Sequence, residues 1–400
     1  MRKIDVLALI LSIIAIIIVS VSTYMYFSTL SELYKEVKII NQRLSNLEFI
    51  FTKPTYCPEV KYAKLFSIKC DGPVKIVRDA LNRTILLIPK NLSVSLTQYF
   101  ISKYRPDVVI KIPTEKIVLF SSTQVALIWR IDREYNLGLL RKVVAIAWGQ
   151  RYRWYIPEIK KLIENGTIID IGYADSPDYE KLITLKPDLV VIYTIPGYEP
   201  SVKLIQKLEE LKIPYVVDNE WMESTFLGRF EWIKFLASFF NLDEKVSKLF
   251  NKIVSEVENI RRKLSEVKCR PGIAWFIIYR GIVWTPRPGS YVHDLIRTCS
   301  GIYLYENVSK VDLEVVISLA NKTDILIYSS YLVESIDDIL KEEPRLEVLK
   351  AIREGRVYAF HENIWQVGYA YPEILIKDLC YIVHSEIFRE YELHFFKRLT

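Results

Sequence analysis

Aromatic and arginine side chains gather at the ends of the buried strands that this sequence predicts. Ligands of parallel sheets bind at the carboxyl ends of strands. Aromatic faces and guanidinium groups suit a large, flat and partly anionic ligand, because they bind it by stacking and by charge-assisted hydrogen bonds. Ordinary packing is the alternative for any one of the aromatics, so the hypothesis depends on their recurrence at strand ends. The candidate ligand-binding residues are Trp148, Tyr152, Tyr193, Trp284, Arg287, Tyr291, Trp365 and Tyr369.

Sequence motifs of the common enzyme classes are missing. The chain contains no G-x-G-x-x-G, no Walker loop, no G-x-S-x-G and no H-E-x-x-H. Only four histidines occur, and no two of them have the spacing of a metal-binding pair on one helix. We therefore expect no enzyme activity, no cofactor and no metal held by the protein itself. A metal-inserting enzyme is the remaining enzymatic alternative, with His361 as its candidate residue.

One helix–strand unit occurs twice along the chain. It reads DYEKLITLKPDLVVIYT over 178–194 and, more loosely, DLEVVISLANKTDILIYSS over 312–330. Each copy has a glutamate early in its predicted helix, Glu180 in the first and Glu314 in the second. A carboxylate in the first turn of a helix interacts favourably with the helix dipole, which is the structural explanation for both residues.

Strands and helices that alternate along the chain are expected to position these residues. Short apolar strands alternate with amphipathic helices over 115–223 and again over 268–400, which is typical of parallel sheets covered by helices. Residues 224–267 between them are predicted to be helical, and a final helix is expected near 371–388. The sequence therefore predicts an α/β fold, with two doubly wound α/β lobes joined by a long connector helix. One apolar stripe on the connector consists of Val246, Leu249, Phe250, Ile253, Val257, Ile260 and Leu264.

The N-terminus has the composition of a membrane anchor. No residue from Val6 to Leu30 is charged, and about 20 apolar residues are enough for a helix to span a bilayer. Arg2 and Lys3 precede this run, which favours a cytoplasmic N-terminus and an extracellular location for the rest of the chain. We predict an uncleaved, single-pass transmembrane helix over 1–30, and a cleaved signal peptide is the alternative.

Two smaller regions lie between the anchor and the first lobe. Residues 31–53 are predicted to form a helical stalk with a heptad seam, through which weak self-association is possible. Residues 54–114 read as strands and turns, and we expect a small β-rich extension. The apolar positions of the seam are Leu33, Val37, Ile40, Leu44, Leu47 and Phe51.

Composition excludes some partners and agrees with an extracellular location. The 400 residues carry 54 basic and 48 acidic side chains without a basic block, so we expect no nucleic-acid partner. Among the five cysteines, Cys57 and Cys70 could close a small loop and two of the others could pair, while buried free thiols are the alternative. The Asn-x-Ser/Thr sequences make five residues candidates for glycosylation: Asn82, Asn91, Asn165, Asn307 and Asn321.

Residues 115–390 resemble the class III solute-binding proteins of ABC importers, which capture iron–siderophores, haem or cobalamin. The motif with the closest likeness is IIDIGYADSPDYEKLITLKPDLVVIY, and IVLFSSTQVALIW, STFLGRFEWIKFLASFFN, WTPRPGSYVHDLI and GRVYAF are similar to further segments of that family. The resemblance implies that a ligand lies between two lobes and that a surface glutamate of each lobe docks on the permease. By position in the motif these residues are Glu180 and Glu314. The N-terminal helix, the stalk and the extension depart from the family pattern.

The residues and the resemblance together predict a membrane-anchored extracellular binding protein. It is expected to capture an iron chelate (a siderophore, haem or a corrinoid) and to deliver it to an ABC permease with its ATPase. A surface sensor or structural receptor with the same two-lobed fold, without transport, is the alternative.

Overall fold

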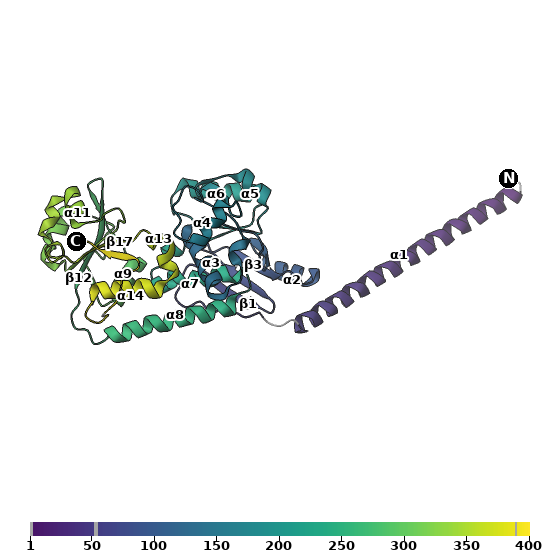
Figure 1. The fold of residues 1–400 in the computed structure, drawn as a ribbon. Helices are drawn as coiled ribbons and strands as arrows, with labels where there is room; N and C mark the ends of the chain where they lie inside the picture. Colours follow the sequence, from purple (N-terminus) through teal and green to yellow (C-terminus); the bar gives the residue numbers. More distant parts are fainter. Residues whose placement is uncertain (1–2, 52–54, 389) are drawn as a thin grey trace.

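The computed structural model describes residues 3–51, 55–388 and 390–400. Helix α1 (Lys3–Phe51) is continuous and projects away from the folded body of the chain, with part of it close to residues 94–104 (Figure 1). It contains no proline or glycine, and the hydroxyl groups of Thr23 and Thr29 each donate to the carbonyl oxygen four residues earlier. Both hydroxyls are therefore hydrogen-bonded within the helix. The segment Ile10–Asn41 is long and apolar enough to cross a membrane.

The predicted stalk is the C-terminal part of α1. Leu33, Val37 and Ile40 of its seam are exposed. The side chains of the last three seam positions lie outside the described residues. Self-association through the seam stays a prediction.

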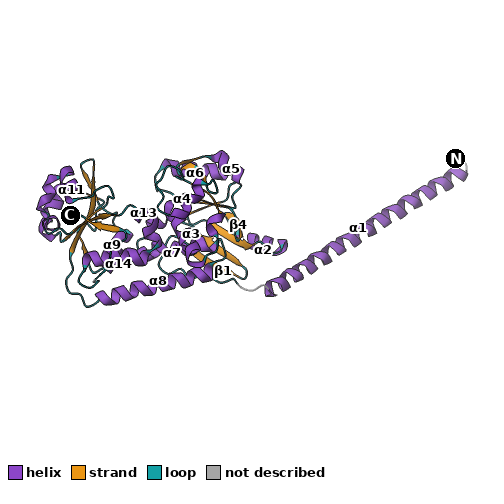
Figure 2. Cartoon of the chain, in the orientation of Figure 1, coloured by secondary structure: helices purple, strands orange, loops and turns teal. Residues whose placement is uncertain are grey.

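The extension is a four-stranded sheet with one helix. The order is β1-β2-β3-β4, in which β1, β2 and β3 pair antiparallel and β4 lies parallel to β3. Figure 2 shows β1 and β4 in orange. Helix α2 (Val94–Tyr104) makes the parallel crossover and was not predicted. Its N-cap Ser93 and its buried Leu96 and Phe100 were the available signals. The strands are β1 (Ser67–Asp71), β2 (Val74–Arg78), β3 (Thr84–Pro89) and β4 (Val108–Ile112).

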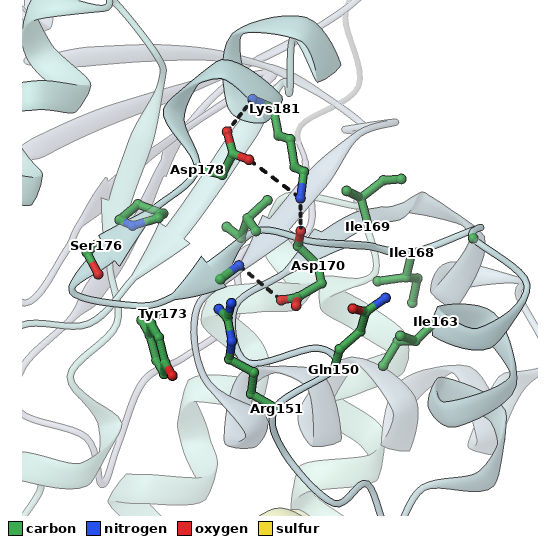
Figure 3. Close-up of a pocket in the computed structure, with 14 residues that line it drawn as sticks. Gln150, Arg151, Ile163, Ile168, Ile169, Asp170, Tyr173, Ser176, Asp178 and Lys181 are labelled. Atoms are coloured by element: carbon green, nitrogen blue, oxygen red, sulfur yellow. Dashed lines mark hydrogen bonds and ion pairs between the residues drawn. The ribbon is translucent and has the colours of Figure 1, made fainter.

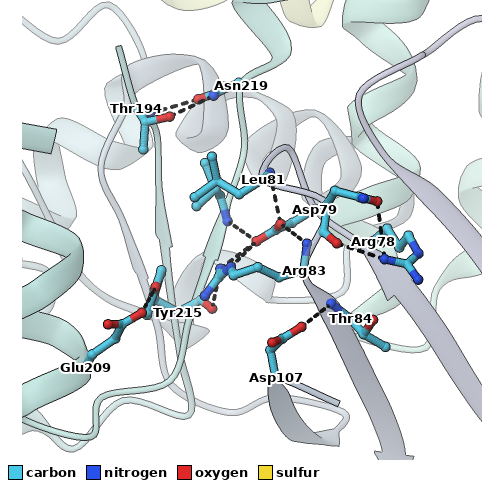
Figure 4. A network of polar contacts seen from close by, with 12 residues as sticks. Arg78, Asp79, Leu81, Arg83, Thr84, Asp107, Thr194, Glu209, Tyr215 and Asn219 are labelled. Atoms are coloured by element: carbon cyan, nitrogen blue, oxygen red, sulfur yellow. Dashed lines mark hydrogen bonds and ion pairs between the residues drawn. The ribbon is translucent and has the colours of Figure 1, made fainter. Parts of the chain in front are cut away.

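A turn of the extension pairs with the edge of the first lobe, at β11 (Tyr215–Val217) (Figure 4). The Ala80 N–H donates to the Val217 carbonyl oxygen, and the Val217 N–H donates to the Asp79 carboxylate, each at 3.1 Å. Arg83 pairs with the same carboxylate, and its guanidinium carbon lies 3.9 Å from the centre of the Tyr215 ring. The extension thus covers an edge strand that would otherwise expose unpaired backbone groups.

Buried carboxylates hold the chain that enters the extension. Both Glu231 oxygens lie within 3.0 Å of backbone N–H groups of residues 61–63, and Lys234 Nζ donates to Glu231 at 2.7 Å. Glu223 accepts in the same way from the N–H groups of residues 64 and 65. Charge-assisted hydrogen bonds of this kind are stronger than neutral ones, so they fix the extension on the connector.

The first lobe is a parallel sheet of order β11-β10-β5-β6-β7. Its central strands are buried on both faces, because Val118 and Val190 pack in one apolar cluster while Leu119 and Val191 pack in another. The strand order reverses between β5 and β10, which makes the gap beyond their carboxyl ends a topological switch point. The strands not yet bounded are β5 (Ile117–Leu119), β6 (Val143–Ile146), β7 (Ile169–Asp170) and β10 (Leu189–Ile192). The helices are α3 (Ser122–Tyr135), α4 (Pro157–Glu164), α5 (Tyr179–Leu185) and α6 (Glu199–Glu210), and a small hairpin has β8 (Gly172–Tyr173) and β9 (Ser176–Pro177).

Two helices connect the lobes. Helix α7 (Phe226–Ser238) is buried along its whole length, and α8 (Asp243–Leu264) runs beneath both lobes (Figure 1). All seven residues of the predicted apolar stripe on α8 are buried, which confirms that stripe.

The second lobe has a mixed sheet of order β15-β13-β12-β16-β17-β18, with β14 beside β12. Its centre is parallel, whereas β13, β15 and β18 are antiparallel to their neighbours. The strands are β12 (Gly272–Tyr279), β13 (Ile282–Trp284), β14 (Ile302–Tyr303), β15 (Lys310–Val311), β16 (Ile325–Tyr328), β17 (Val357–Phe360) and β18 (Phe396–Arg398). The helices are α9 (Tyr291–Thr298), α10 (Leu313–Ser318), α11 (Ile336–Glu342), α12 (Lys350–Arg353), α13 (Ile364–Val367) and α14 (Pro372–Val383).

The C-terminal end corrects one detail of the prediction. The helix expected near 371–388 is α14, which ends at Val383, and the chain then returns to the sheet as β18. The carboxylate of Asp378 accepts hydrogen bonds from the backbone N–H groups of His394 and Phe395. These contacts place the last residues beside β17 instead of extending the helix.

Four cysteines form two disulfides. Cys57–Cys70 joins the start of the extension to β1, and Cys299–Cys380 joins the end of α9 to α14. Cys269 is free and exposed. The structure therefore contains the small loop predicted between Cys57 and Cys70, and a disulfide between two of the other three cysteines.

Candidate functional site

A cavity of about 680 Å³ lies at the carboxyl ends of β5, β6 and β10. This position is the switch point of the first sheet, where helices and loops diverge and leave space for a ligand. Most of its lining is apolar or aromatic, with Arg151 and Glu220 as its charged side chains. The residues are Phe120, Ser121, Ser122, Ala147, Trp148, Arg151, Tyr152, Trp154, Tyr193, Ile195, Glu220 and Trp221.

Trp148 is held on the wall by its backbone. It has a φ of 64°, in the left-handed region that few non-glycine residues adopt, and its N–H donates to the Gly172 carbonyl oxygen at 2.7 Å. Its indole ring packs edge-on against Tyr173 at 4.8 Å. This turn directs the chain away from β6 just after the strand ends and leaves the half-buried indole on the cavity wall.

The two predicted tyrosines of this cavity differ in burial. Tyr152 is exposed and packs edge-on against Trp154 at 5.7 Å. Tyr193 is half-buried, and burial raises its pKa. Its hydroxyl therefore stays protonated and can donate a hydrogen bond to a ligand.

A second cavity, of about 410 Å³, faces the C-terminal lobe. Trp284 and Trp365 are exposed on its wall, and Lys310 Nζ lies 4.3 Å from the centre of the Trp284 ring. Tyr369 is buried, and its hydroxyl lies 2.7 Å from that of Tyr291. The residues are Trp221, Arg229, Trp275, Ile277, Trp284, Thr285, Pro286, Arg287, Ser290, Tyr291, Val292, Ser329, Phe360, Trp365 and Tyr369.

Trp221 lines both cavities and so joins them into one cleft between the lobes. The guanidinium carbon of Arg287, from the second lobe, lies 5.4 Å from the centre of the Trp221 ring. A ligand in this cleft would contact aromatic faces of both lobes, with Arg151 on one side and Arg287 on the other.

A buried polar network lies beneath Trp221. Arg229 pairs with Glu220, which also accepts from the Thr123 hydroxyl at 2.6 Å. The Arg229 guanidinium carbon lies 3.5 Å from the centre of the Tyr369 ring. Burial alone would lower the pKa of Arg229, but the carboxylate of Glu220 outweighs it and holds that pKa above the ordinary value. Burial and the charge of Glu220 also raise the pKa of Asp218 well above its usual range.

Direct contacts link the lobes beside the cleft. Tyr155 donates its backbone N–H to Gln366 Oε1 at 2.8 Å and its hydroxyl to Glu362. Arg153 pairs with Glu362 at 2.9 Å, and Gln366 Nε2 donates to the Arg153 carbonyl oxygen. Burial and the neighbouring Glu362 carboxylate raise the pKa of Tyr155 to about 12. The loop after β6 and helix α13 are thus joined across the lobes.

A further hollow, of about 630 Å³, lies on the other side of Arg151, between β7 and α5 (Figure 3). Its charged groups already have partners in the chain. Lys181 Nζ donates to the Asp170 carbonyl oxygen at 2.9 Å and pairs with Asp178 at 3.5 Å. The Asp170 carboxylate accepts from the N–H groups of Gly149 and Gly172. The interlobe cleft is therefore the candidate ligand site.

All eight predicted ligand-binding residues line the cleft, three in the first cavity and five in the second. Their roles in binding stay predictions. Sequence reasoning missed Phe120, Glu220, Arg229, Trp275 and Phe360. Phe120 directly follows a strand and Glu220 comes three residues after one, so both had the same signal as the chosen residues, whereas Trp275 and Phe360 lie within strands and Arg229 within a buried helix.

The two predicted docking glutamates are exposed and lie in the first turns of short helices. Glu180 follows the N-cap Asp178 of α5, whose side chain accepts from the Lys181 N–H. Glu314 lies on α10 and pairs with Arg345 at 3.4 Å. An exposed glutamate in the first turn of a helix could contact a partner protein, and it also interacts favourably with the helix dipole. The docking role stays a prediction.

The remaining predicted positions lie on the surface. The five asparagines of the glycosylation sequences are exposed. His361 is also exposed, with Nδ1 2.9 Å from Asn363 Oδ1. Within residues 3–51, 55–388 and 390–400, no three His, Cys, Asp or Glu side chains form a group that could hold a metal ion.

Comparisons with known proteins agree with this architecture. A family model described as periplasmic binding protein matches residues 132–364, more than half of the chain. An uncharacterized lipoprotein of Methanocaldococcus jannaschii is 30% identical over 296 residues, which cover 72% of this chain and 69% of that protein.

Two solved structures have the same fold as this chain at low identity. The periplasmic haem-binding protein RhuT of Roseiflexus sp. RS-1 has a TM-score of 0.52 and 18% identity, over 68% of this chain and 99% of that chain. The periplasmic vitamin B12-binding protein BtuF of Vibrio cholerae has a TM-score of 0.52 and 16% identity, over 70% of this chain and 99% of that chain. The family model and the lipoprotein relative establish that this chain is a member of the periplasmic binding protein family.

Proposed function

We propose that this protein is a membrane-anchored extracellular receptor that captures a metal chelate and delivers it to an ABC permease. The main support for this proposal is the interlobe cleft, in which two aromatic cavities meet at Trp221. Binding sites for organic ligands are concave and mostly apolar, with a few polar groups that set orientation. Haem and vitamin B12, named for two structural neighbours, are ligands of this flat or macrocyclic kind.

The N-terminal helix supports the membrane location. It contains one stretch long and apolar enough to span a bilayer, and a lipoprotein is among the relatives. An anchor confines the receptor near its permease, which raises the effective concentration of the bound ligand there. In this proposal Glu180 and Glu314 carry the docking contact, one from each lobe.

Binding by the full chain in detergent micelles tests the proposal. Haemin, cyanocobalamin and ferrichrome would be titrated by native mass spectrometry and by quenching of tryptophan fluorescence. We expect one of these classes to bind at one molecule per chain and to be released unchanged.

Substitutions of two residues that line the cleft test whether the ligand binds there. Trp284→Ala and Arg287→Ala should each weaken binding by about tenfold, since each removes one stacking or charge-assisted contact. Tyr279→Ala is the matched control, because Tyr279 is an exposed aromatic outside the residues that line the two cavities. Absence of binding across the panel, or turnover of the ligand, would contradict the proposal.

A further inference from the structure

The start of helix α9 forms a distinct part of the cleft wall. Residues 284–292 lead from β13 into α9, and seven of these nine residues line the second cavity. Gly289 has a φ of 68°, a left-handed conformation that turns the chain into the helix. The first turn of α9 therefore borders the cleft.

Ser290 is placed at the N-cap of α9, yet its side chain does not cap the helix. An N-cap serine ordinarily accepts a hydrogen bond from the second or third N–H of the helix. Ser290 is only 7% exposed, and its hydroxyl has no hydrogen-bond partner among the described residues. A buried hydroxyl without a partner is costly in free energy, and a ligand atom in the cavity would satisfy it.

The backbone adds donors at the same place. The N–H groups of the first turn of a helix have no acceptor within the helix, and the helix dipole adds partial positive charge there. Tyr291 and Val292 are the first two residues of α9, and both line the cavity. A helix start with free N–H groups is a favourable position for an oxyanion.

The charge around the cavity is positive. Two arginines and no acidic residue are among the described residues that line it. Arg229 is neutralised by Glu220, whereas Arg287 is exposed and forms no ion pair with a described carboxylate. The Trp221 indole N–H, beneath the Arg287 guanidinium, also has no partner among the described residues.

We propose that the start of α9 is an oxyanion subsite that binds a carboxylate of the captured chelate. The Ser290 hydroxyl, the first N–H groups of α9 and the Arg287 guanidinium donate to that group. The inference rests on the proposed function and adds a selection rule. Chelates with a peripheral carboxylate bind in preference to neutral ones, with the carboxylate against the second lobe.

Matched ligand pairs test the subsite, with the full chain in detergent micelles. The pairs are haemin and its dimethyl ester, a cyanocobalamin monocarboxylic acid and cyanocobalamin, and ferrichrome A and ferrichrome. In each pair, one member has a free carboxylate that the other lacks. For the class that binds, we expect the acid to bind at least about tenfold more tightly than its neutral partner, as one charge-assisted contact allows.

Two variants assign that preference to the subsite. Arg287→Gln should weaken binding of the acid about tenfold more than that of the neutral member, and Ser290→Ala about threefold more. Arg280→Gln is the matched control, because Arg280 is exposed and lies outside the residues that line the cavities. Thermal unfolding of each variant, followed by circular dichroism, checks that it is folded.

The outcomes separate the two proposals. If both members of a pair bind equally, or if the preference survives in Arg287→Gln, the subsite is refuted while the proposed function stands. If no member of any pair binds, the proposed function fails and the subsite fails with it. A preference that falls in both variants and not in the control supports the subsite.

Discussion

Replacing Arg229 by methionine would remove the cation that pairs with Glu220 beneath the cleft. The guanidinium group is bonded to Glu220 and stacks on Tyr369. Asp218 is buried beside them, with one carboxylate oxygen accepting from the Glu220 N–H and the other without a partner among the described residues. Methionine retains an unbranched apolar stem but leaves the Glu220 side chain with the Thr123 hydroxyl as its donor.

The size of the effect follows from burial. The side chains of Arg229 and Glu220 are each 7% exposed, so the screening that limits exposed pairs to about 1 kcal/mol or less does not apply. Removing one partner of a buried pair costs about 3–5 kcal/mol, because the other charge is left uncompensated. We expect Arg229→Met to lose this much free energy of unfolding near pH 8, with a fall in Tm on the order of 10 °C.

The loss should shrink as the pH falls. Burial and Glu220 raise the pKa of Asp218 in the folded chain, and Arg229 opposes that shift. A group whose pKa is higher in the folded than in the unfolded chain binds more protons when folded, so stability decreases as the pH rises. Without Arg229 the pKa of Asp218 rises further, so the variant should regain part of the lost stability as the pH falls.

Thermal unfolding of the full chain, followed by far-ultraviolet circular dichroism at several pH values, measures both effects. Arg133→Met is the matched control, because Arg133 is exposed and lies 5.2 Å from the Trp129 ring centre, and it should cost less than about 1 kcal/mol. The double variant Arg229→Met/Glu220→Gln should recover part of the loss. A loss below about 1 kcal/mol near pH 8, or one that is unchanged near pH 5, would refute the reasoning.

Reversal of Glu180 and Glu314 to arginine should leave ligand affinity within about twofold and abolish the ligand-dependent stimulation of ATP hydrolysis by the permease complex in liposomes, since complementary charge governs docking. Stimulation that persists in the double variant would exclude the docking role. Asp218→Asn should raise the free energy of unfolding near pH 8 and flatten its decline with pH, because burial disfavours the charged form of Asp218. Urea denaturation at two pH values measures this, and an unchanged midpoint near pH 8 would contradict it. Replacing Cys299 and Cys380 by serine should cost about 4 kcal/mol, because the disulfide closes a loop with a sequence separation of 81. Urea denaturation of the double variant measures the cost, and a stability equal to that of the unmodified chain would show that the bond does not constrain the unfolded state.

Most of the fold was predicted from hydrophobic periodicity in the sequence. The stripe from Val246 to Leu264 faces the core at helical spacing, and the runs that became β10 and β16 are fully buried. Such patterns are local, so one sequence suffices to read them. Helix α2 was missed because only Leu96 and Phe100 of it are buried and its β-branched and aromatic residues resemble those of the strands around it.

The candidate site was predictable where a side chain directly follows a strand. Trp148 and Tyr193 come just after β6 and β10, and the switch-point rule places such residues beside a ligand. Arg229 carries no such signal, because it lies within a helix whose residues are all buried, and only the tertiary fold brings Glu220 to it. Antiparallel strands such as β18 are equally hard to predict, since a three-residue strand has too few positions to show alternation.

The same tertiary contacts indicate how a ligand would gain affinity in the cleft proposed as its binding site. Helix α8 joins the lobes as one rigid element of 22 residues, and the bonds of Tyr155 with Gln366 and Glu362 already hold the lobes together beside the cavities. A site that is preformed in this way loses little conformational freedom when a ligand binds, so more of the contact energy remains as affinity. The fixed separation of the cavities then makes ligand shape a criterion for binding. Selectivity among ligands that fit would then come from the polar groups on the walls, and those at the start of α9 include the Ser290 hydroxyl and the Arg287 guanidinium, which can both donate.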